Sequence, residues 1–182
     1  MQNRTWLATA LATLLAVGVL YWIGHGPVHA KTAMPQPLSA ESKAPAVPQT
    51  PFTDAQGGSH RIADFKGHYV LINLWATWCA PCVSELPALA RLQEAVPGLK
   101  VVAVDVGHDK SDAAAAFLKS HNVARLGTYV DTELALLHAF GAYGLPTTVL
   151  IDPSGKEIAK AEGPGEWASP ASVAYFKDLT KS

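Results

Sequence analysis

The two cysteines of this chain, Cys79 and Cys82, are the only cysteines in 182 residues, and just two residues separate them. They follow an apolar run, Val70 to Trp75, that is typical of a buried strand, and they open a segment, about Ala80 to Ala95, with helical spacing of leucine and alanine. At the start of a helix, unpaired backbone N–H groups and the helix dipole favour a thiolate on the first sulfur. The spacing therefore predicts thiol–disulfide exchange. A structural bridge is disfavoured, because so short a loop removes little entropy from the unfolded chain.

The charge balance and the histidine pattern exclude several function classes. The chain has 14 basic and 15 acidic residues and no cationic run, so nucleic acid is not an expected partner. Its 7 histidines are scattered without a short-spaced pair, and no further cysteine exists to complete a zinc site. We therefore expect no metal and no cofactor apart from a redox-active disulfide.

The N-terminal part of the chain is apolar and uncharged from Trp6 to Ile23, with Arg4 before it. As a helix with ~1.5 Å rise per residue, this segment spans about 27 Å, enough to cross a bilayer core. The sequence thus predicts a transmembrane signal-anchor at residues 6–23, with residues 1–5 in the cytoplasm and the remainder exported. The alternative is a signal peptide that is cut after Ala30, which would leave a soluble exported protein.

Residues 24–51 are rich in proline and small polar residues, and we expect an extended tether there. A folded domain is predicted over residues 52–182, as an α/β sandwich with parallel strands first and an antiparallel hairpin last. The expected elements are a hairpin or edge strand at 52–65, strands at 69–75, 99–106, 128–130, 147–151 and 156–160, and helices at 80–95, 112–119, 131–140 and 170–179.

Several motifs together show a family resemblance. They are Asn73-Leu74-Trp75-Ala76-Thr77-Trp78-Cys79-Ala80-Pro81-Cys82, Glu85-Leu86-Pro87, Tyr143-Gly144-Leu145-Pro146-Thr147-Thr148, Ile151-Asp152-Pro153-Ser154-Gly155 and Gly163-Pro164-Gly165-Glu166-Trp167. With these motifs the chain resembles the thioredoxin superfamily from about Phe52 to Leu179, and within it the membrane-tethered TlpA-like thiol–disulfide oxidoreductases of the bacterial cell envelope. The resemblance implies a thioredoxin-like three-layer sandwich, with a mixed central sheet flanked by helices. It also implies a reductase of other envelope proteins, in cytochrome c or haem–copper oxidase assembly.

Three residues are the candidate catalytic groups. Cys79 is expected to attack a client disulfide, and Cys82 to resolve the mixed disulfide. Glu85 lies three residues after Cys82, on the same helical face. Spacing alone leaves two alternatives for it, a partly buried acid with a raised pKa that relays protons, or a solvated acid in the first helical turn. The resemblance favours the relay. Asn73 stands where thioredoxins carry a buried aspartate, so the thioredoxin proton-transfer scheme does not carry over directly.

The remaining candidates support the cysteines or bind substrate. Trp78 is either a shield packed beside the thiols or simply a core residue, and Pro81 shapes the ring between the cysteines. The resemblance implies a cis peptide bond at Pro146, in a loop beside Cys79. Trp167 is expected to pack the last helix onto the sheet. The candidate substrate-binding residues are Leu145, through its backbone, together with Thr147 and Tyr143.

The resemblance also implies a location and partners. We expect a single-pass protein of the bacterial inner membrane, held in the bilayer by residues 6–23, with its catalytic domain in the periplasm. Its expected partners are disulfide-containing envelope proteins and a membrane thiol–disulfide electron donor. Three alternatives remain: a copper-binding metallochaperone on the same fold, a thiol peroxidase, and a disulfide oxidant or isomerase. The first two are disfavoured by the residues around the cysteines, but the residue pattern leaves the direction of exchange open.

Overall fold

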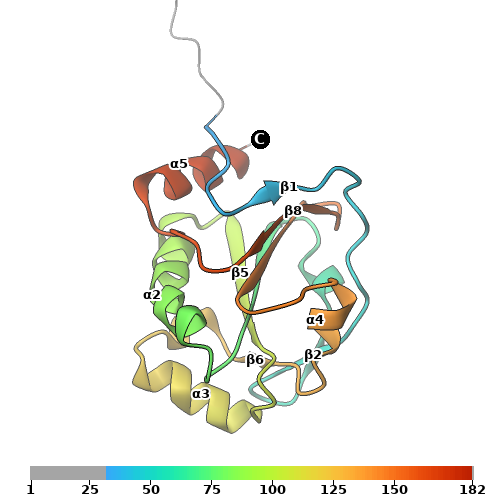
Figure 1. The fold of residues 1–182 in the computed structure, drawn as a ribbon, viewed down its shortest axis with the longest axis vertical. Coiled ribbons are helices and arrows are strands. Elements are labelled where there is room, and N and C mark those ends of the chain that lie inside the picture. The colour runs from blue at the N-terminus through green and yellow to red at the C-terminus, as the bar shows by residue number, and fades with distance from the viewer. Residues whose placement is uncertain (1–31, 182) are drawn as a thin grey trace, which may run out of the picture. The chain divides into compact units, whose positions relative to one another are not determined.

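The computed structural model describes residues 32–181, which form a mixed sheet with helices on both faces (Figure 1). Within these residues the sheet has 8 strands in the order β1-β8-β7-β4-β5-β6-β2-β3. The strands are β1 (Ser39–Ala40), β2 (Phe52–Asp54), β3 (Ser59–His60), β4 (Tyr69–Trp75), β5 (Leu99–Asp105), β6 (Tyr129–Val130), β7 (Thr147–Ile151) and β8 (Glu157–Glu162). The helices are α2 (Ala80–Ala95), α3 (Ser111–Ser120), α4 (Ala135–Ala139) and α5 (Pro170–Leu179), with short 3-10 helices η1 (Ile62–Phe65) and η2 (Ala124–Leu126).

The sheet is mixed, as predicted. Strands β4, β5 and β6 are parallel, whereas β7 pairs antiparallel with both β4 and β8. The hairpin predicted near residue 52 is the antiparallel pair β2–β3, and the helices predicted at 80–95 and 170–179 are α2 and α5. The thioredoxin-like α/β fold is therefore confirmed.

Strand β4 is buried on both faces and divides the core in two. Leu71 and Trp75 pack in one cluster with residues of α2 and α5, and Ile72 and Leu74 pack in the other with residues of α4. The helices accordingly form the outer layers of a three-layer sandwich (Figure 1). Because side chains alternate along a strand, Asn73 faces the α2 side together with Leu71 and Trp75.

The proline-rich segment differs from its prediction. In its described part, residues 32–51 are not an extended tether: β1 pairs antiparallel with β8, and Ala46 forms a further bridge with Lys156. Leu38 and Val47 are buried, at 2% and 5% exposed. The folded unit therefore begins at Thr32 and not at residue 52.

The physical reason is that prolines still offer carbonyl groups to a sheet edge. The Glu157 N–H, on β8, donates to the Pro45 carbonyl, while the Leu38 N–H donates to the Pro35 carbonyl in a turn that precedes β1. Strand β8 would otherwise expose an unpaired edge, which proteins commonly cover. A few apolar side chains between the prolines, together with Met34, then pack onto the domain.

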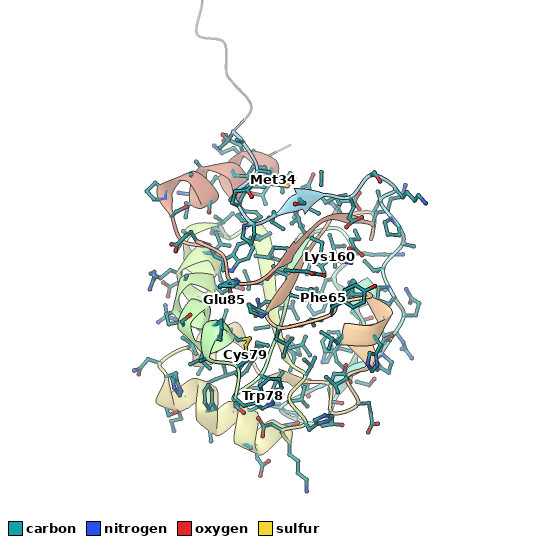
Figure 2. The ribbon with its side chains drawn as sticks, viewed as in Figure 1. Met34, Phe65, Trp78, Cys79, Glu85 and Lys160 are labelled. Carbon is teal, nitrogen blue, oxygen red and sulfur yellow. A yellow bond between two sulfur atoms is a disulfide. The ribbon has the colours of Figure 1, made fainter. Side chains whose placement is uncertain are left out.

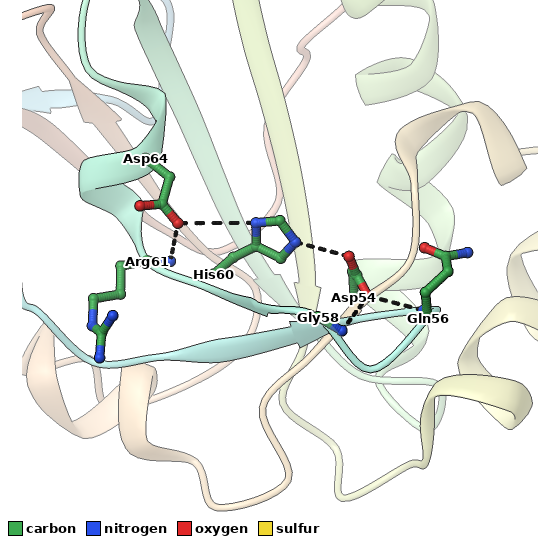
Figure 3. Close-up of polar contacts among 6 residues, drawn as sticks. All are labelled: Asp54, Gln56, Gly58, His60, Arg61 and Asp64. Atoms are coloured by element: carbon green, nitrogen blue, oxygen red, sulfur yellow. Dashed lines mark hydrogen bonds and ion pairs between the residues drawn. The ribbon is translucent and has the colours of Figure 1, made fainter.

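The turn between β2 and β3 is fixed by one side chain (Figure 3). Asp54 accepts hydrogen bonds from the backbone N–H groups of Gln56 at 2.9 Å and Gly58 at 2.7 Å, and from His60 Nε2 at 2.8 Å. The hydrogen bond from His60 is the main cause that lowers the pKa of Asp54. This pattern is an Asx-type turn, which the Asp-to-Gly run of the sequence indicates.

Helix α4 is shorter than predicted. The Asp131 carboxylate accepts hydrogen bonds from the N–H groups of Glu133 at 3.1 Å and Leu136 at 2.7 Å, and Leu134 adopts a left-handed conformation with φ 56°. Asp131 therefore caps the start of this segment, but a turn separates it from the helix.

No helix within residues 32–181 is both long enough and apolar enough to span a membrane. The anchor predicted at residues 6–23 and the cytoplasmic stretch predicted at 1–5 lie outside the described residues.

Candidate active site

The cysteine pair lies at the junction of β4 and α2. Strand β4 ends at Trp75, and Cys79 is the N-cap residue of α2. The Cys82 N–H donates to Cys79 Sγ at 3.3 Å, so the first sulfur occupies the place of a capping acceptor. Pro81 lies in the first turn of α2, where its missing N–H leaves no helical hydrogen bond unmade.

The two sulfurs form a disulfide and differ in access. Cys79 is 6% exposed, whereas Cys82 has no exposed surface. An incoming thiol or disulfide therefore reaches Cys79 first. This geometry agrees with the predicted order of attack, in which Cys79 reacts with the partner and Cys82 with Cys79.

Trp78 and Tyr143 are exposed aromatic residues near this end of the sheet. Trp78 is 68% exposed, so it is not a core residue. Its indole lies against the loop that follows β5, because a Cβ placed on Gly107 would be 3.0 Å from Trp78 Nε1. Figure 2 shows Trp78 next to Cys79, with Glu85 on the other side of Cys79 in that view.

The loop before β7 lies at the same end of the sheet, since Thr147 is paired with Leu74 near the end of β4. The Leu145–Pro146 peptide bond is cis, as the resemblance implies. Leu145 is half-buried and contacts both core clusters, and Tyr143 is 94% exposed.

Thr147 does not offer its side chain to a substrate. It has no exposed surface, and its hydroxyl donates to the Gly144 carbonyl at 2.7 Å. Its structural task is to hold the Pro146 loop. The prediction that Thr147 binds substrate therefore fails for its side chain, because the hydroxyl is already used inside the fold.

Glu85 is a buried, fully hydrogen-bonded acid. It is 4% exposed, so the alternative of a solvated first-turn glutamate is wrong. Asn73 Nδ2 donates to Glu85 Oε1 at 2.7 Å, while Gly165 N at 3.0 Å and Trp167 Nε1 at 2.7 Å donate to Oε2. Burial raises the pKa of Glu85, and the three hydrogen bonds oppose that rise without cancelling it.

Two of these donors were missed as site residues. Trp167 is fully buried, and besides packing it carries a hydrogen bond to Glu85. Gly165 must be glycine, because a Cβ there would lie 2.5 Å and 2.6 Å from atoms of the Trp167 ring. The Gly163–Trp167 motif is visible in the sequence, but nothing local shows that it contacts a glutamate on α2.

Glu85 also borders a small cavity of about 240 Å³, which is lined by residues of α2 and of the segment 164–166. Arg91 and Gly165 are among its other lining residues. Neither cysteine is among the residues that line this cavity.

A second buried acid, Asp105, ends β5 and was not singled out from the sequence. It has no exposed surface, and burial, with a further contribution from Asp109, raises its pKa to about 6. Asp109 in turn accepts a hydrogen bond from Thr77 Oγ1 at 2.6 Å, within the active-site loop. An aspartate at the end of an otherwise apolar strand is the signal that could have identified this position.

The described part of the chain holds no grouping of three or more His, Cys, Asp or Glu side chains that could bind a metal ion.

Comparison with known proteins gives consistent similarities. The family described as AhpC/TSA matches residues 41–159. The thiol-disulfide oxidoreductase ResA of Bacillus subtilis (strain 168) is 30% identical over 164 residues, which cover 89% of this chain and 87% of the relative. ResA of Geobacillus thermodenitrificans is 31% identical over 157 residues, or 85% of each chain. A crystal structure of a thioredoxin-family thiol:disulfide interchange protein from Chlorobium tepidum has a TM-score of 0.58 at 26% identity, and the match covers 78% of this chain and 97% of that one.

Proposed function

The chain belongs to the AhpC/TSA family and is a protein thiol–disulfide oxidoreductase, and from this premise we propose that it reduces disulfides in client proteins. The observation that carries the proposal is the Cys79–Cys82 pair at the N-terminus of α2. The Cys82 N–H points at Cys79 Sγ, and Cys79 is 6% exposed whereas Cys82 is fully buried. Such a sulfur is suited to be a thiolate nucleophile.

The reaction is a two-step exchange. The Cys79 thiolate attacks one sulfur of the client disulfide, which breaks the client S–S bond, forms a mixed disulfide and releases one client thiolate. The Cys82 thiolate then attacks Cys79 Sγ, which forms the Cys79–Cys82 disulfide and releases the second client thiolate. Two electrons pass to the client, whose two thiolates take up protons. A dithiol donor must afterwards reduce the pair again.

Glu85 is proposed to take the proton of Cys82. Cys82 has no exposed surface, so water does not reach its thiol directly. Glu85 lies one helical turn further along α2, and its raised pKa brings it closer to that of a thiol. The cavity beside Glu85 then passes the proton to solvent while a client covers Cys79.

The charges around the Cys79–Cys82 pair favour reduction of the client as the direction of exchange. A stabilised thiolate makes a dithiol protein oxidising, because it stabilises the reduced form. No Lys, Arg or His side chain is buried within residues 32–181, and the buried ionisable groups nearest along the chain to the active-site loop are the acids Glu85 and Asp105. Nearby acids disfavour a thiolate, so they favour the oxidised pair and a low reduction potential.

The cellular setting is part of the same proposal. A segment at residues 6–23 that anchors the chain in the bacterial inner membrane would place the catalytic domain in the periplasm, where a membrane dithiol donor would recharge it. The resemblance to TlpA-like proteins supports envelope clients in cytochrome c or haem–copper oxidase assembly. The relatives named ResA are thiol-disulfide oxidoreductases, which supports the proposed chemistry.

The reduction potential of the pair tests the direction. It is measured by equilibrating the protein with thiol–disulfide buffers and quantifying the alkylated cysteines. A value near or below ~−270 mV, that of thioredoxin, supports a reductase, whereas a value near ~−120 mV would assign a strong oxidant. Clients are identified with Cys82→Ser, which should hold them as mixed disulfides on Cys79. The matched control, Cys79→Ser, should capture none.

A further inference from the structure

The loop that follows β5 packs against the active-site loop and carries two carboxyl groups, Asp105 and Asp109. Strand β5 pairs in register with β4 as far as the last residue of each, so Asp105 lies beside the start of the active-site loop. Gly107 packs against that loop, since a Cβ there would be 2.8 Å from Ala76 Cβ and 3.0 Å from Trp78 Nε1. The proposed exchange mechanism uses neither carboxyl group.

Asp105 lacks a partner for one of its oxygens. Oδ1 accepts a hydrogen bond from the Gly107 N–H at 2.7 Å, but Oδ2 is buried and has no hydrogen-bond partner among the described residues. A buried carboxylate oxygen without a donor is destabilising. A proton on Oδ2 would remove the charge and supply a donor for a neighbouring acceptor.

The charged groups around Asp105 come from its own loop and from the segment after β6. Asp109 raises the pKa of Asp105, and His108 lowers it. The backbone N–H of Asp131 donates to the Asp105 carbonyl at 2.8 Å, but its carboxylate is turned toward the start of α4. The active-site loop contributes the neutral Thr77 and Trp78, and the charged residues that follow, Lys110 and Asp112, are exposed.

We propose that Asp105 is a positioning residue for thiol–disulfide exchange, which shares a proton with Asp109 and so holds Thr77 and Trp78 in place beside Cys79. While the proton is present, the pair carries one negative charge, and Asp109 remains the acceptor of the Thr77 hydroxyl. When the proton leaves for solvent, two neighbouring carboxylates repel each other. Asp109, which is half-buried, then turns outward. The active-site loop thereby loses the hydrogen bond between Thr77 and Asp109 that anchors it.

The transition falls in a range that can be measured. Burial and Asp109 raise the pKa of Asp105 to about 6, so the anchor is present in mild acid and weakened above neutral pH. The inference rests on the proposed function, because it concerns the reactivity of Cys79.

The test uses the oxidised full-length protein, in which the cysteines do not titrate. The indole N–H signal of Trp78, assigned with Trp78→Phe, is followed by ¹H–¹⁵N NMR between about pH 4.5 and 8.5. The wild-type signal should shift with a midpoint near 6, and Asp105→Asn should abolish that midpoint. Asp109→Asn should lower the midpoint, since a neutral amide replaces a like charge.

Two control variants separate Asp105 from its neighbours. Asp112→Asn removes an exposed acid nearby and should leave the midpoint unchanged. His108→Asn removes the neighbouring imidazole, and asparagine tolerates the left-handed conformation at this position, φ 71°. The midpoint should persist in His108→Asn. Its loss there, or an unchanged titration in Asp105→Asn, overturns the proposal.

Alkylation of Cys79 in the reduced protein links the titration to reactivity. The pH profile of the wild type should contain an inflection near 6 that Asp105→Asn lacks, while both retain the inflection of the thiol. If Cys79 reacts normally but Asp105→Asn has the wild-type profile, the inference fails and the proposed function stands. If Cys79 does not react with iodoacetamide at any pH, the proposed function itself fails.

Discussion

Asp105→Asn should stabilise the protein in a strongly pH-dependent way. The pKa of Asp105 rises from its ordinary 3.8 to about 6 on folding. Each unit corresponds to ~1.4 kcal/mol, so burying the ionised side chain destabilises the folded state by about 3 kcal/mol. Because the folded state binds this proton more tightly, the penalty is absent below pH 3.8, grows between 3.8 and about 6, and is complete above that range. Asparagine has nearly the same shape, keeps an acceptor for the Gly107 N–H and carries no charge.

The assay is urea unfolding followed by near-ultraviolet circular dichroism, at about pH 4 and about pH 8. The quantity of interest is the change in unfolding free energy on substitution at pH 8 minus the change at pH 4. This difference cancels any packing effect common to both conditions, and it should reach about 2 to 3 kcal/mol in favour of the variant at pH 8. The exposed Asp112→Asn is the control and should give a difference near zero. Equal changes at both pH values would refute the argument that the ionised side chain of Asp105 destabilises the folded state.

Three further outcomes are expected. Leu38→Ala should lower the unfolding free energy by about 2–5 kcal/mol in urea unfolding, as for a buried leucine. The control Ser39→Ala, at an exposed neighbour, should change it little. If Leu38→Ala has no effect, the proline-rich segment is a tether and not part of the folded domain. Gly165→Ala forces the Trp167 ring to move and should lower the unfolding free energy by about 1–3 kcal/mol. Its activity, measured by reduction of a disulfide substrate, should fall as far as that of Trp167→Phe. Glu85→Gln should retain most of the stability but slow the resolving step at Cys82, seen as accumulated mixed disulfide in rapid-quench experiments; an unchanged resolving rate would exclude the relay.

The central part of the fold was predictable because its signals are local. Strand β4 is a nearly continuous apolar run, interrupted by Asn73, because both of its faces are covered. Cys79 and Cys82 follow it after a short loop, at the start of a helix. The limits of α2 and α5 follow from apolar spacing and from prolines in their first turns. In these segments local preference and tertiary structure agree, so the pattern alone is sufficient.

The features that were missed depend on partners far along the chain. The segment around β1 has a composition typical of a tether, and it is ordered because β8 offers an edge about 120 positions later in the chain. Glu85 is acceptor to donors at Gly165 and Trp167, and no spacing on α2 reveals whether an acid in its first turns is buried or solvated. Thr147 carries a hydroxyl of the kind that can bind a substrate, but this hydroxyl donates to a backbone carbonyl of its own loop.

The amide of Asn73 can hydrogen-bond Glu85 in both of the protonation states that the proposed relay requires. Asn73 Nδ2 donates to Glu85 Oε1 at 2.7 Å and to Thr148 Oγ1 at 2.9 Å, and Asn73 Oδ1 has no hydrogen-bond partner among the described residues. If Glu85 gains a proton, a half-turn of the amide places Oδ1 where it accepts the new O–H, and the Thr148 hydroxyl changes from acceptor to donor. One unpaired amide atom is exchanged for another, and no backbone atom has to move. A carboxylate at this position would instead stand 2.7 Å from a second carboxylate, and their repulsion would raise the pKa of the pair. On the proposed relay, the amide can therefore hydrogen-bond Glu85 in either protonation state, and for the same reason the glutamine substitution is expected to leave the fold intact while it removes the proton.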